Sequence, residues 1–125
     1  MLADIQLEDL DGIPVARVRG EVDMSNAGEL STTLQNAVQQ TAAGLIVDFT
    51  PTQYLDSAGL HFIFDLAKRL RDRGQRLHLV VPPSSPVAAV LDIVQIEVLA
   101  SRSQGLDEAL EKLRAHAADV PHEAV

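Results

Sequence analysis

The feature that most constrains the fold is a nearly unbroken apolar run, Leu45-Ile46-Val47-Asp48-Phe49, between two segments of helical periodicity. An apolar run without alternation is typical of a strand that helices cover on both faces. In residues 26–41 and 57–73, by contrast, apolar residues recur every three or four positions, which predicts two amphipathic helices. We therefore predict an α/β fold in which residues 44–49 form the middle strand of the sheet.

The other elements are predicted from shorter patterns. Apolar and polar residues alternate in 5–8 and 16–22, which predicts two half-buried strands joined by a hairpin turn at Asp11-Gly12. The resulting order is ββαβαβαβα, a small mixed β-sheet of about five strands with four helices packed on it. The later elements in this order are a turn at 50–53, strands at 76–81 and 97–100, a short helix from Ser85-Pro86, and a final helix capped by Ser103.

Each predicted helix has one face that we expect to be buried. These faces comprise Ala27, Leu30, Leu34, Ala37, Val38 and Thr41 in the first helix, Leu60, Ile63, Phe64, Ala67 and Leu70 in the second, Val87, Val90, Leu91 and Val94 in the third, and Leu106, Leu110, Leu113 and Ala117 in the fourth. Phe62 is predicted to lie off the second of these faces, and we favour a packed helix residue over an exposed partner contact there. Glu29, three residues after Asn26, suggests a capping arrangement, and Gly74 is expected to end the second helix.

Composition limits the classes of protein to consider. With 125 residues, 46% of them apolar, the chain is expected to form one domain over 1–118 with a disordered tail at 119–125. No apolar run reaches the roughly 20 residues of a membrane span, and the first residues do not resemble a signal peptide, so we expect a cytoplasmic protein without membrane insertion. The chain has no cysteine, and its four histidines (His61, His78, His116, His122) lack metal-ligand spacing. We therefore expect no disulfide, structural zinc or cofactor.

The charge is unevenly distributed along the chain. The net charge of −8 argues against nucleic-acid binding, which requires clustered basic residues. Residues 1–65 contain ten acidic side chains and only two basic ones, whereas 66–125 contain eight of each. Two interpretations remain open: a solvated acidic surface that aids solubility, or an acidic face that steers a basic partner protein.

The segment Tyr54-Leu55-Asp56-Ser57-Ala58-Gly59-Leu60 places a hydroxyl where a loop meets a helix. One interpretation is an ordinary N-cap, worth about 1 kcal/mol. The other is a modification site, because free backbone N–H groups and the helix dipole favour negative charge at this position. A phosphate on Ser57 would then be tolerated by the fold, while beside Asp56 it would repel an acidic partner strongly.

Three motifs occur in order: Gly20-Glu21-Val22-Asp23, Asp56-Ser57-Ala58-Gly59-Leu60 and Asp107-Glu108-Ala109-Leu110. With these motifs the sequence resembles the STAS domains, and among them the bacterial anti-sigma factor antagonists, over nearly all of residues 3–115. The resemblance implies a small mixed β-sheet with helices on its faces, in agreement with the element order above. It also implies that Ser57 is phosphorylated by a serine kinase that serves as the anti-sigma factor.

The resemblance further implies a partner-binding surface and a mechanism. Asp23 matches an acidic residue near the kinase contact, and the predicted partner-binding residues are Glu21, Asp23, Met24, Ser25, Asn26, Asp56, Ala58, Gly59 and Leu60. The unphosphorylated protein would bind the anti-sigma kinase and free a sigma factor. Phosphorylation of Ser57 would release the kinase until a serine phosphatase of the PP2C type restores binding. The protein would be a regulator rather than an enzyme, and a monomer or weak dimer.

The chain departs from the family pattern at three positions. Ala58 stands where many members have a second hydroxyl, so Ser57 alone would accept phosphate in this loop. His61 and Phe62 stand where a small residue followed by an aliphatic one is common, and a bulky pair there would reshape the kinase contact.

Two alternative functions remain. In the first alternative, the chain is a STAS subunit or scaffold of a lipid-transport or ligand-sensing complex, and Ser57 only caps its helix. The weaker alternative is a small hydrolase that uses Ser57 with His61; the sequence offers neither a Gly-x-Ser-x-Gly turn nor an acid to orient His61.

A second interpretation of Asp48, within the central strand, is the phosphoryl-accepting aspartate of response-regulator receivers. A receiver also needs a lysine near the last strand, where this chain has only Arg102, and its sheet does not open with two successive strands. We therefore favour a structural aspartate that binds loop amides. The loop 82–86 lacks the glycines of a phosphate-binding loop.

Overall fold

The computed structural model describes residues 3–38, 42–98 and 100–119. The strands are β1 (Asp4–Leu10), β2 (Ile13–Val22), β3 (Gly44–Asp48), β4 (Thr52–Leu55), β5 (Arg76–Val80) and β6 (Ser101–Ser103). The helices are α1 (Ala27–Ala37), α2 (Ser57–Asp72), α3 (Pro86–Leu91) and α4 (Leu106–Asp119), with a short 3₁₀ helix, η1 (Ile96–Val98), before β6.

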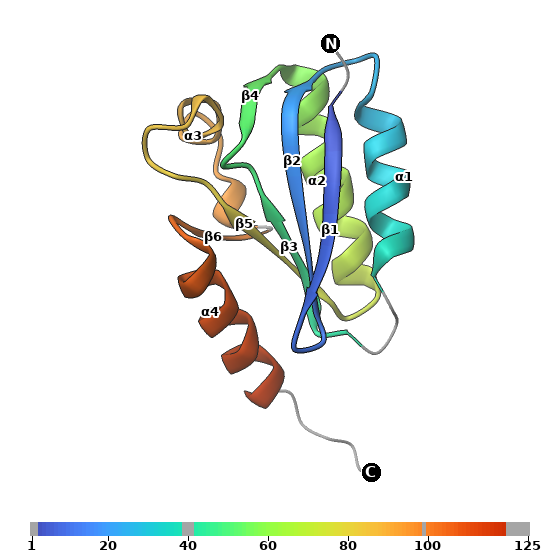
Figure 1. The fold of residues 1–125 in the computed structure, drawn as a ribbon, viewed down its shortest axis with the longest axis vertical. Helices are drawn as coiled ribbons and strands as arrows, with labels where there is room; N and C mark the ends of the chain where they lie inside the picture. Colours follow the sequence, from blue (N-terminus) through green and yellow to red (C-terminus); the bar gives the residue numbers. More distant parts are fainter. Residues whose placement is uncertain (1–2, 39–41, 99, 120–125) are drawn as a thin grey trace.

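The strands form one mixed sheet in the order β1-β2-β3-β5-β6, with β4 paired to β2 outside this path. The β1–β2 pair is antiparallel and all the other pairs are parallel. In Figure 1, α2 lies behind β1 and β2 with α1 beside it on the right, whereas α4 lies on the left and packs on the opposite face of the sheet. The predicted α/β class, a small mixed sheet with four helices packed on it, is confirmed.

The central strand and the hairpin form where the sequence predicts them. Every residue of β3 is buried, as expected for a strand between two helical layers. In the hairpin turn, Asp11 and Gly12 have φ values of 56° and 86°, the left-handed pair that matches the twist of two antiparallel strands. At the start of β3 the backbone of β5 passes so closely that a Cβ on Gly44 would lie 2.1 Å from the carbonyl oxygen of Arg76.

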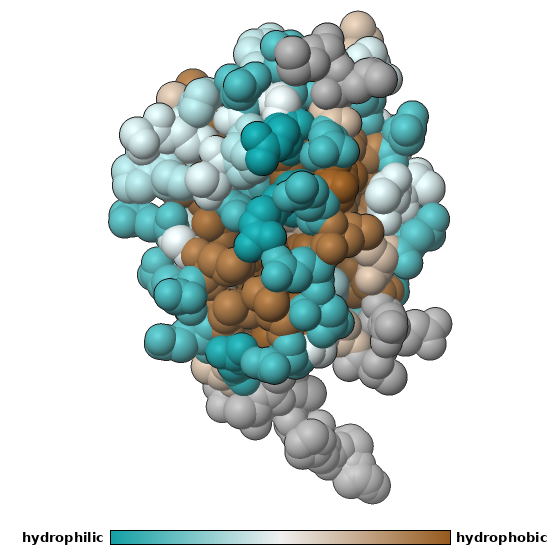
Figure 2. All heavy atoms as spheres, viewed as in Figure 1, coloured by the Kyte–Doolittle hydropathy of each residue, from teal (hydrophilic) through white to brown (hydrophobic). Residues whose placement is uncertain are grey.

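Apolar residues pack in two separate cores, one on each face of the sheet. The larger lies between the sheet and α1, α2 and α3, and its largest side chains include Phe49, Leu34, Ile63, Leu66 and Leu70. The smaller lies under α4 and comprises Ile13, Val15, Ile46, Val80, Ala109, Leu110 and Leu113. Figure 2 shows the α4 face, where apolar surface gathers near the middle of the molecule and hydrophilic residues surround it.

Three strand predictions are corrected by the structure. Residues 52–55 form β4 rather than part of a turn, because the second half of the ten-residue β2 extends past β3 and offers them a pairing edge. The Thr52 hydroxyl also donates to the carbonyl oxygen of Val18 (2.5 Å). The last strand lies at 101–103 rather than 97–100, where Ile96–Val98 form η1 instead. Leu7 of β1 is 51% exposed, so this edge strand is less buried than its alternation suggests.

Each predicted helix is observed, but α3 ends at Leu91, before the predicted Val94, and the buried faces differ in part. In α2 the buried residues are Gly59, Phe62, Ile63, Leu66, Ala67 and Leu70, while Leu60 and Phe64 are half-buried. Phe62, 3% exposed, was therefore wrongly placed off the buried face, although its favoured interpretation as a packed residue is confirmed. The spacing 59, 62, 63, 66, 67, 70 is a regular helical stripe that the bulky Leu60 and Phe64 conceal in the sequence.

The helix ends agree with the sequence in two of four cases. Ser85 caps α3, since its hydroxyl accepts from Val87 N (3.1 Å), and Gly74 follows α2 with φ +74°. Asn26 makes no side-chain cap to α1. Ser103 lies in β6 and does not cap α4.

Several predictions fall where the structure gives no description. Thr41, His122 and the predicted tail beyond Asp119 lie outside the described residues, as do the side chains of His116 and Ala117. Asp119 itself is the last residue of α4. Among the helices that are described, none combines the length and the apolarity that crossing a membrane requires.

Candidate functional site

The parallel pairing of β2 with β4 brings the first two sequence motifs together. Glu21 pairs with Tyr54 and Val22 with Leu55, so both strands end at the same edge of the sheet. Beyond the pair, Asp56 N donates to the carbonyl oxygen of Val22 (3.3 Å). The loop that enters α1 and the loop that enters α2 therefore adjoin, and the nine predicted partner-binding residues form one region.

The loop before α1 is held by hydrogen bonds among its own residues. Asn26 is buried; its Oδ1 accepts from Asp23 N (3.0 Å) and its Nδ2 donates to the carbonyl oxygen of Glu21 (2.9 Å). Asp23 Oδ1 accepts from the hydroxyl (2.5 Å) and the backbone N–H (2.9 Å) of Ser25, and these bonds lower the pKa of the Asp23 carboxyl. Asn26 thus fixes the loop from inside, while Met24 projects outward with 84% of its surface exposed.

The first turn of α2 is capped by Asp56, not by Ser57. Asp56 Oδ1 accepts from Ala58 N (2.9 Å) and Gly59 N (3.1 Å). Ser57 is the first helical residue and is exposed, and its hydroxyl has no hydrogen-bond partner in the part of the chain that the structure describes. The interpretation of Ser57 as the helix cap is therefore wrong. The backbone of Asp56 is extended, and this places the Asp56 carboxylate over the free backbone N–H groups of the first helical turn.

Gly59 is required by close packing behind this turn. A Cβ on Gly59 would lie 2.5 Å from Leu55 Cδ1 and 3.2 Å from the carbonyl oxygen of Val22. Gly59 is buried, whereas Ala58 and Leu60 are half-buried. Like Asn26, it shapes the surface from within rather than forming part of it.

A groove of about 510 Å³ runs between α1 and α2 beside Ser57. Small residues of α1 line one wall: Ala27, Gly28 and Ser31. The other wall carries Ser57, Ala58 and His61, with Phe62 also lining the groove. Met24 lines it as well, and farther along α2 it is lined by Asp65 and Arg69, an ion pair whose Oδ2 and Nε lie 3.0 Å apart.

Sequence reasoning missed Gly28, Ser31, Asp65 and Arg69 as groove residues. The signal available was helical spacing: Ala27 and Ser31 are four residues apart, as are Ser57, His61, Asp65 and Arg69, and such residues share a helix face. What the sequence did not reveal is that these two faces oppose each other.

Ser57 and His61 share the groove without forming a catalytic pair. Both side chains are exposed, and no hydrogen bond joins them within the described residues. The next acid on this face, Asp65, is paired with Arg69 rather than with His61. The geometry thus lacks the base and orienting acid that would activate a serine nucleophile.

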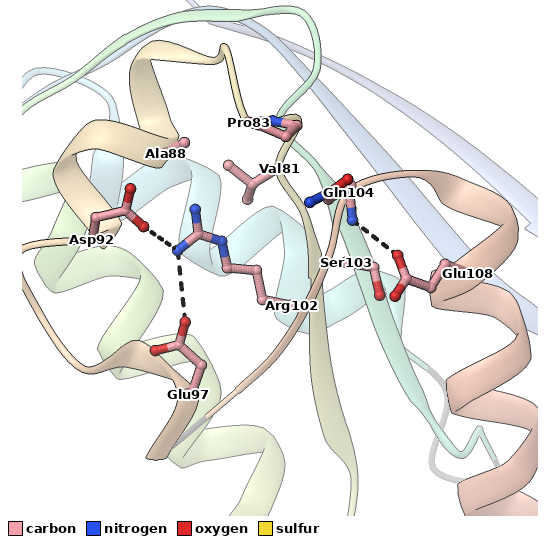
Figure 3. Close-up of a pocket in the computed structure, with 9 residues that line it drawn as sticks. All are labelled: Val81, Pro83, Ala88, Asp92, Glu97, Arg102, Ser103, Gln104 and Glu108. Carbon is pink, nitrogen blue, oxygen red and sulfur yellow. Dashed lines mark hydrogen bonds and ion pairs between the residues drawn. The ribbon is translucent and has the colours of Figure 1, made fainter.

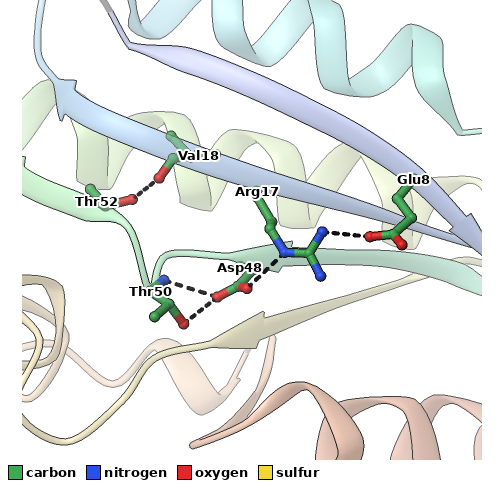
Figure 4. A network of polar contacts seen from close by, with 6 residues as sticks. All are labelled: Glu8, Arg17, Val18, Asp48, Thr50 and Thr52. Atoms are coloured by element: carbon green, nitrogen blue, oxygen red, sulfur yellow. Dashed lines mark hydrogen bonds and ion pairs between the residues drawn. The ribbon is translucent and has the colours of Figure 1, made fainter.

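Asp48 forms the network of loop contacts predicted for a structural aspartate. Its Oδ1 accepts from the backbone N–H (2.9 Å) and hydroxyl (2.5 Å) of Thr50, and its Oδ2 lies 3.6 Å from Arg17 Nε (Figure 4). Arg17 also pairs with Glu8. The side chain is thereby fully engaged at the end of β3.

A serine and a histidine do form a contact under α4, remote from Ser57 in the sequence. The Ser103 hydroxyl and His78 Nε2 are 2.7 Å apart, and both residues are buried. Burial, with a smaller contribution from Lys112, lowers the pKa of His78 to about 4, so this imidazole is neutral at pH 7. The prediction that His78 lies at the edge of the core is replaced by full burial.

A second cavity, of about 520 Å³, opens near the ends of β5 and β6 (Figure 3). Inside it, Arg102 pairs with Asp92 (2.9 Å) and Glu97 (3.6 Å). Glu108 accepts from Gln104 N (3.2 Å), and this bond, with Lys112, lowers the pKa of Glu108. These charges satisfy one another, and none of the predicted partner-binding residues lines this cavity. Across the described residues, no three histidine, aspartate or glutamate side chains gather into a metal site.

Comparison with known families gives a match over most of the chain. The model of the STAS domain matches residues 4–116, which include the paired loops and the groove. The chain belongs to the STAS domain family. The resemblance to STAS domains expected from the three motifs is thus confirmed.

One curated relative and two solved structures place this STAS domain among known ones. A Bordetella bronchiseptica protein, BtrV, named as a candidate anti-sigma factor antagonist, is 30% identical over 67 residues, which is 54% of this chain and 58% of that protein. The unphosphorylated form of the anti-sigma factor antagonist SpoIIAA superposes with a TM-score of 0.66, 22% identity, and coverage of 89% of this chain and 98% of that one. A Wolinella succinogenes protein of the sulfate transporter family superposes with a TM-score of 0.72, 18% identity, and coverage of 89% and 92%. At 22% and 18% identity, these two structural similarities show a shared fold and nothing further.

Proposed function

We propose that this STAS domain is an anti-sigma factor antagonist whose affinity for an anti-sigma factor kinase is controlled by phosphorylation of Ser57. The unphosphorylated protein binds the kinase through the two loops and the groove, and a sigma factor is freed. The phosphorylated protein is released, and a serine phosphatase of the PP2C type reverses the modification. The protein itself catalyses no reaction in this scheme.

The exposure of the Ser57 hydroxyl is the observation that carries this proposal. A kinase must reach the hydroxyl with the γ-phosphate of ATP, and Ser57 is exposed at the first position of a sixteen-residue helix. Its hydroxyl takes no part in capping, because Asp56 already fills that role. Phosphorylation therefore breaks no hydrogen bond among the residues that the structure describes, and the helix dipole tolerates the added charge.

Release of the partner follows from where the phosphate would stand. The groove beside Ser57 is lined by the apolar residues Met24, Ala27, Ala58 and Phe62 together with Ser31 and His61, and its arginine, Arg69, is already paired with Asp65. A partner that covers this groove would have to strip water from a group with about −1.5 to −2 charges beside the Asp56 carboxylate. Since roughly 1.4 kcal/mol is a tenfold change in affinity, a desolvation cost of several kcal/mol would weaken binding by orders of magnitude.

The loop carboxylates support a second, longer-range contribution. Hydrogen bonds from Ser25 lower the pKa of Asp23, an aspartate that is ionised at neutral pH in any case, and Glu21 lies two residues before it. Negative charge at the rim of a docking surface speeds the approach of a basic partner and is screened by salt. We propose that Glu21 and Asp23 raise the rate at which the kinase associates, whereas the phosphorylation state of Ser57 controls the affinity of the complex.

The likeness to a sulfate transporter family protein keeps one alternative, a STAS scaffold that does not use phosphorylation. In that case the groove would still be a contact surface, but a negative charge at Ser57 would leave partner affinity unchanged. A complex that forms equally well with wild type and Ser57→Asp would favour this alternative.

The direct test is phosphotransfer from radiolabelled ATP by the anti-sigma factor serine kinases of the same genome. We expect one kinase to label the wild-type chain and not Ser57→Ala, while both proteins bind it. Ser31→Ala, which removes the other hydroxyl of the groove, is the matched control and should be labelled normally. Labelling of Ser57→Ala at the wild-type level, or of no variant by any kinase, would contradict the proposal.

A further inference from the structure

His61 follows Ser57 by one helical turn, and both residues line the wall of the groove that α2 provides. Both side chains are exposed, and within the described residues the imidazole makes no hydrogen bond or ion pair. Side chains four residues apart on a helix are neighbours, and each Cα–Cβ bond is tilted towards the N-terminus of the helix. The imidazole of His61 is therefore directed towards the turn that begins at Ser57.

The other charged side chains of the groove are paired with each other. They are Asp65 and Arg69 of α2, whose Oδ2 and Nε lie 3.0 Å apart, while α1 and the loop before it contribute only uncharged side chains to the lining. At 1.5 Å per residue, Arg69 lies roughly 18 Å beyond Ser57 along the helix. Among the residues that line the groove, His61 is thus the one within a turn of Ser57 that can carry positive charge.

A phosphate on Ser57 would change what His61 has beside it. Such a group carries about −1.5 to −2 charges at pH 7 and three strong acceptor oxygens. An imidazole N–H can donate to one of these oxygens, and the protonated ring adds a unit of opposite charge. Histidine is the side chain that gains or loses its proton between about pH 5 and pH 8. The charge left on the phosphate would therefore depend on pH near neutrality.

We propose that His61 is the counter-ion of phosphorylated Ser57 and makes release of the partner dependent on pH. This rests on the proposed function, because it presupposes a phosphate on Ser57. When the imidazole is protonated, the phosphate and the ring together carry one negative charge fewer, so a partner that covers them desolvates less charge. When the imidazole is neutral, the phosphate keeps its full charge. Phosphorylation therefore releases the partner more completely at alkaline than at neutral pH.

The first test needs no partner. The chain with phosphoserine at position 57, introduced during translation, is titrated with acid and followed by phosphorus NMR. The second pKa of phosphoserine is about 6. In the wild type this value should be about 0.5 lower than in the His61→Gln variant, because an adjacent cation favours the phosphate dianion. The His61→Lys variant keeps a positive charge and should restore the lower value. Equal phosphate titrations in the wild type and His61→Gln would overturn the inference.

The second test measures how strongly phosphorylation weakens the binding of the purified kinase that labels the wild-type chain. The ratio of the affinities of the unmodified and phosphorylated chains is determined by titration calorimetry at pH 7 and pH 8.5. For the wild type, this ratio should be about threefold larger at pH 8.5, where the imidazole is neutral.

Two variants at the same position are the matched controls for this ratio. With His61→Gln the ratio should be large and equal at both pH values, because no charge is gained at pH 7. With His61→Lys it should be smaller and again equal, because lysine keeps its charge over this range. A wild-type ratio that is independent of pH, or that changes as much as the ratio of His61→Gln, would contradict the proposal.

The outcomes distinguish this inference from the proposed function. If a kinase labels Ser57 but the phosphate titrates identically in the wild type and His61→Gln, the inference is wrong and the proposed function stands. If no kinase labels the wild-type chain, the proposed function fails, and the pH-dependent release fails with it, whatever the phosphate titration shows.

Discussion

Ser57 and Ser103 each lie near a histidine, but the surroundings of the two hydroxyls differ. Ser57 and His61 share an exposed groove without a hydrogen bond between them. Ser103 and His78 are both buried and 2.7 Å apart, and burial lowers the pKa of the histidine. The same two residue types thus form a free hydroxyl on one side of the molecule and a satisfied polar contact inside it on the other.

Accessibility, rather than residue type, separates a hydroxyl that a modifying enzyme can reach from one that only serves the structure. Changes at Ser57 should alter partner binding and leave stability nearly constant. Changes at the Ser103–His78 pair should alter stability first. Changes at Asp56 and Gly59 should also alter stability, because Asp56 caps α2 and Gly59 packs against Leu55, and both residues help to hold Ser57 at the surface.

The largest effect is expected from charge at Ser57. Ser57→Asp should weaken kinase binding by about 100-fold, because a carboxylate would be desolvated beneath the bound partner. Ser57→Asn, which has nearly the same shape without the charge, is the control and should retain binding within a few-fold. Isothermal titration calorimetry measures both; equal losses in the two variants would show that size, not charge, releases the partner.

The next effect is a pH dependence of stability caused by His78. Its pKa is lowered to about 4 in the folded protein, against roughly 6.5 in an unfolded chain. The unfolded state therefore binds the proton more readily, so stability is highest above pH 6.5 and falls as the pH decreases from 6.5 towards 4. The full loss is about 3 kcal/mol.

Urea denaturation of wild type and His78→Gln at pH 7 and pH 5 measures this term. The wild type should lose about 2 kcal/mol more than the variant between these values, since glutamine does not titrate. Parallel losses would show that protonation of His78 costs the fold little, and that the contact under α4 is less buried than the structure has it.

Gly59→Ala should destabilise the protein by about 1–3 kcal/mol, because its new methyl group must displace Leu55. The Cβ would lie 2.5 Å from Leu55 Cδ1. The matched control is Gly28→Ala, also a glycine in the first turn of a helix, where a Cβ meets open space. Thermal unfolding of the two variants should shift in opposite directions, and equal shifts would contradict the distinction between a packed and an open glycine.

The smallest effect separates the cap from the modified residue. Asp56→Ala should cost about 1 kcal/mol through loss of the N-cap. Ser57→Ala should stay within about 0.5 kcal/mol of wild type, because its hydroxyl is not used by the fold. Chemical denaturation decides between them: a larger loss for Ser57→Ala would restore serine as the cap.

Much of the fold could be predicted where one local signal was strong. The apolar run of β3, the Asp11-Gly12 turn and the Ser85-Pro86 helix start each depend on neighbouring residues alone. β4 could not be predicted, because it exists only where the long β2 extends beyond β3 and offers an edge. The strand at 101–103 was missed for a similar reason: its sequence Ser-Arg-Ser is polar, and it becomes a strand through pairing with β5.

The candidate site was predictable in its parts but not in its assembly. The motifs located Asp23 and Ser57, and the resemblance to STAS domains linked them. The cap was assigned only when the Asp56 carboxylate was found on Ala58 and Gly59. The sequence also does not distinguish Gly59, where a Cβ has no space, from Gly28, where it would meet open space, because the difference lies in the neighbouring atoms.

The central claim is tested most directly by the affinity of the kinase for the chain before and after phosphorylation of Ser57. Protein carrying phosphoserine at position 57, introduced during translation, is compared with unmodified protein by titration calorimetry in the same buffer. The account predicts tight binding of the unmodified chain and at least about a 100-fold weaker affinity of the modified one. Equal affinities would contradict it, because an exposed hydroxyl that can be modified without changing binding is not a switch.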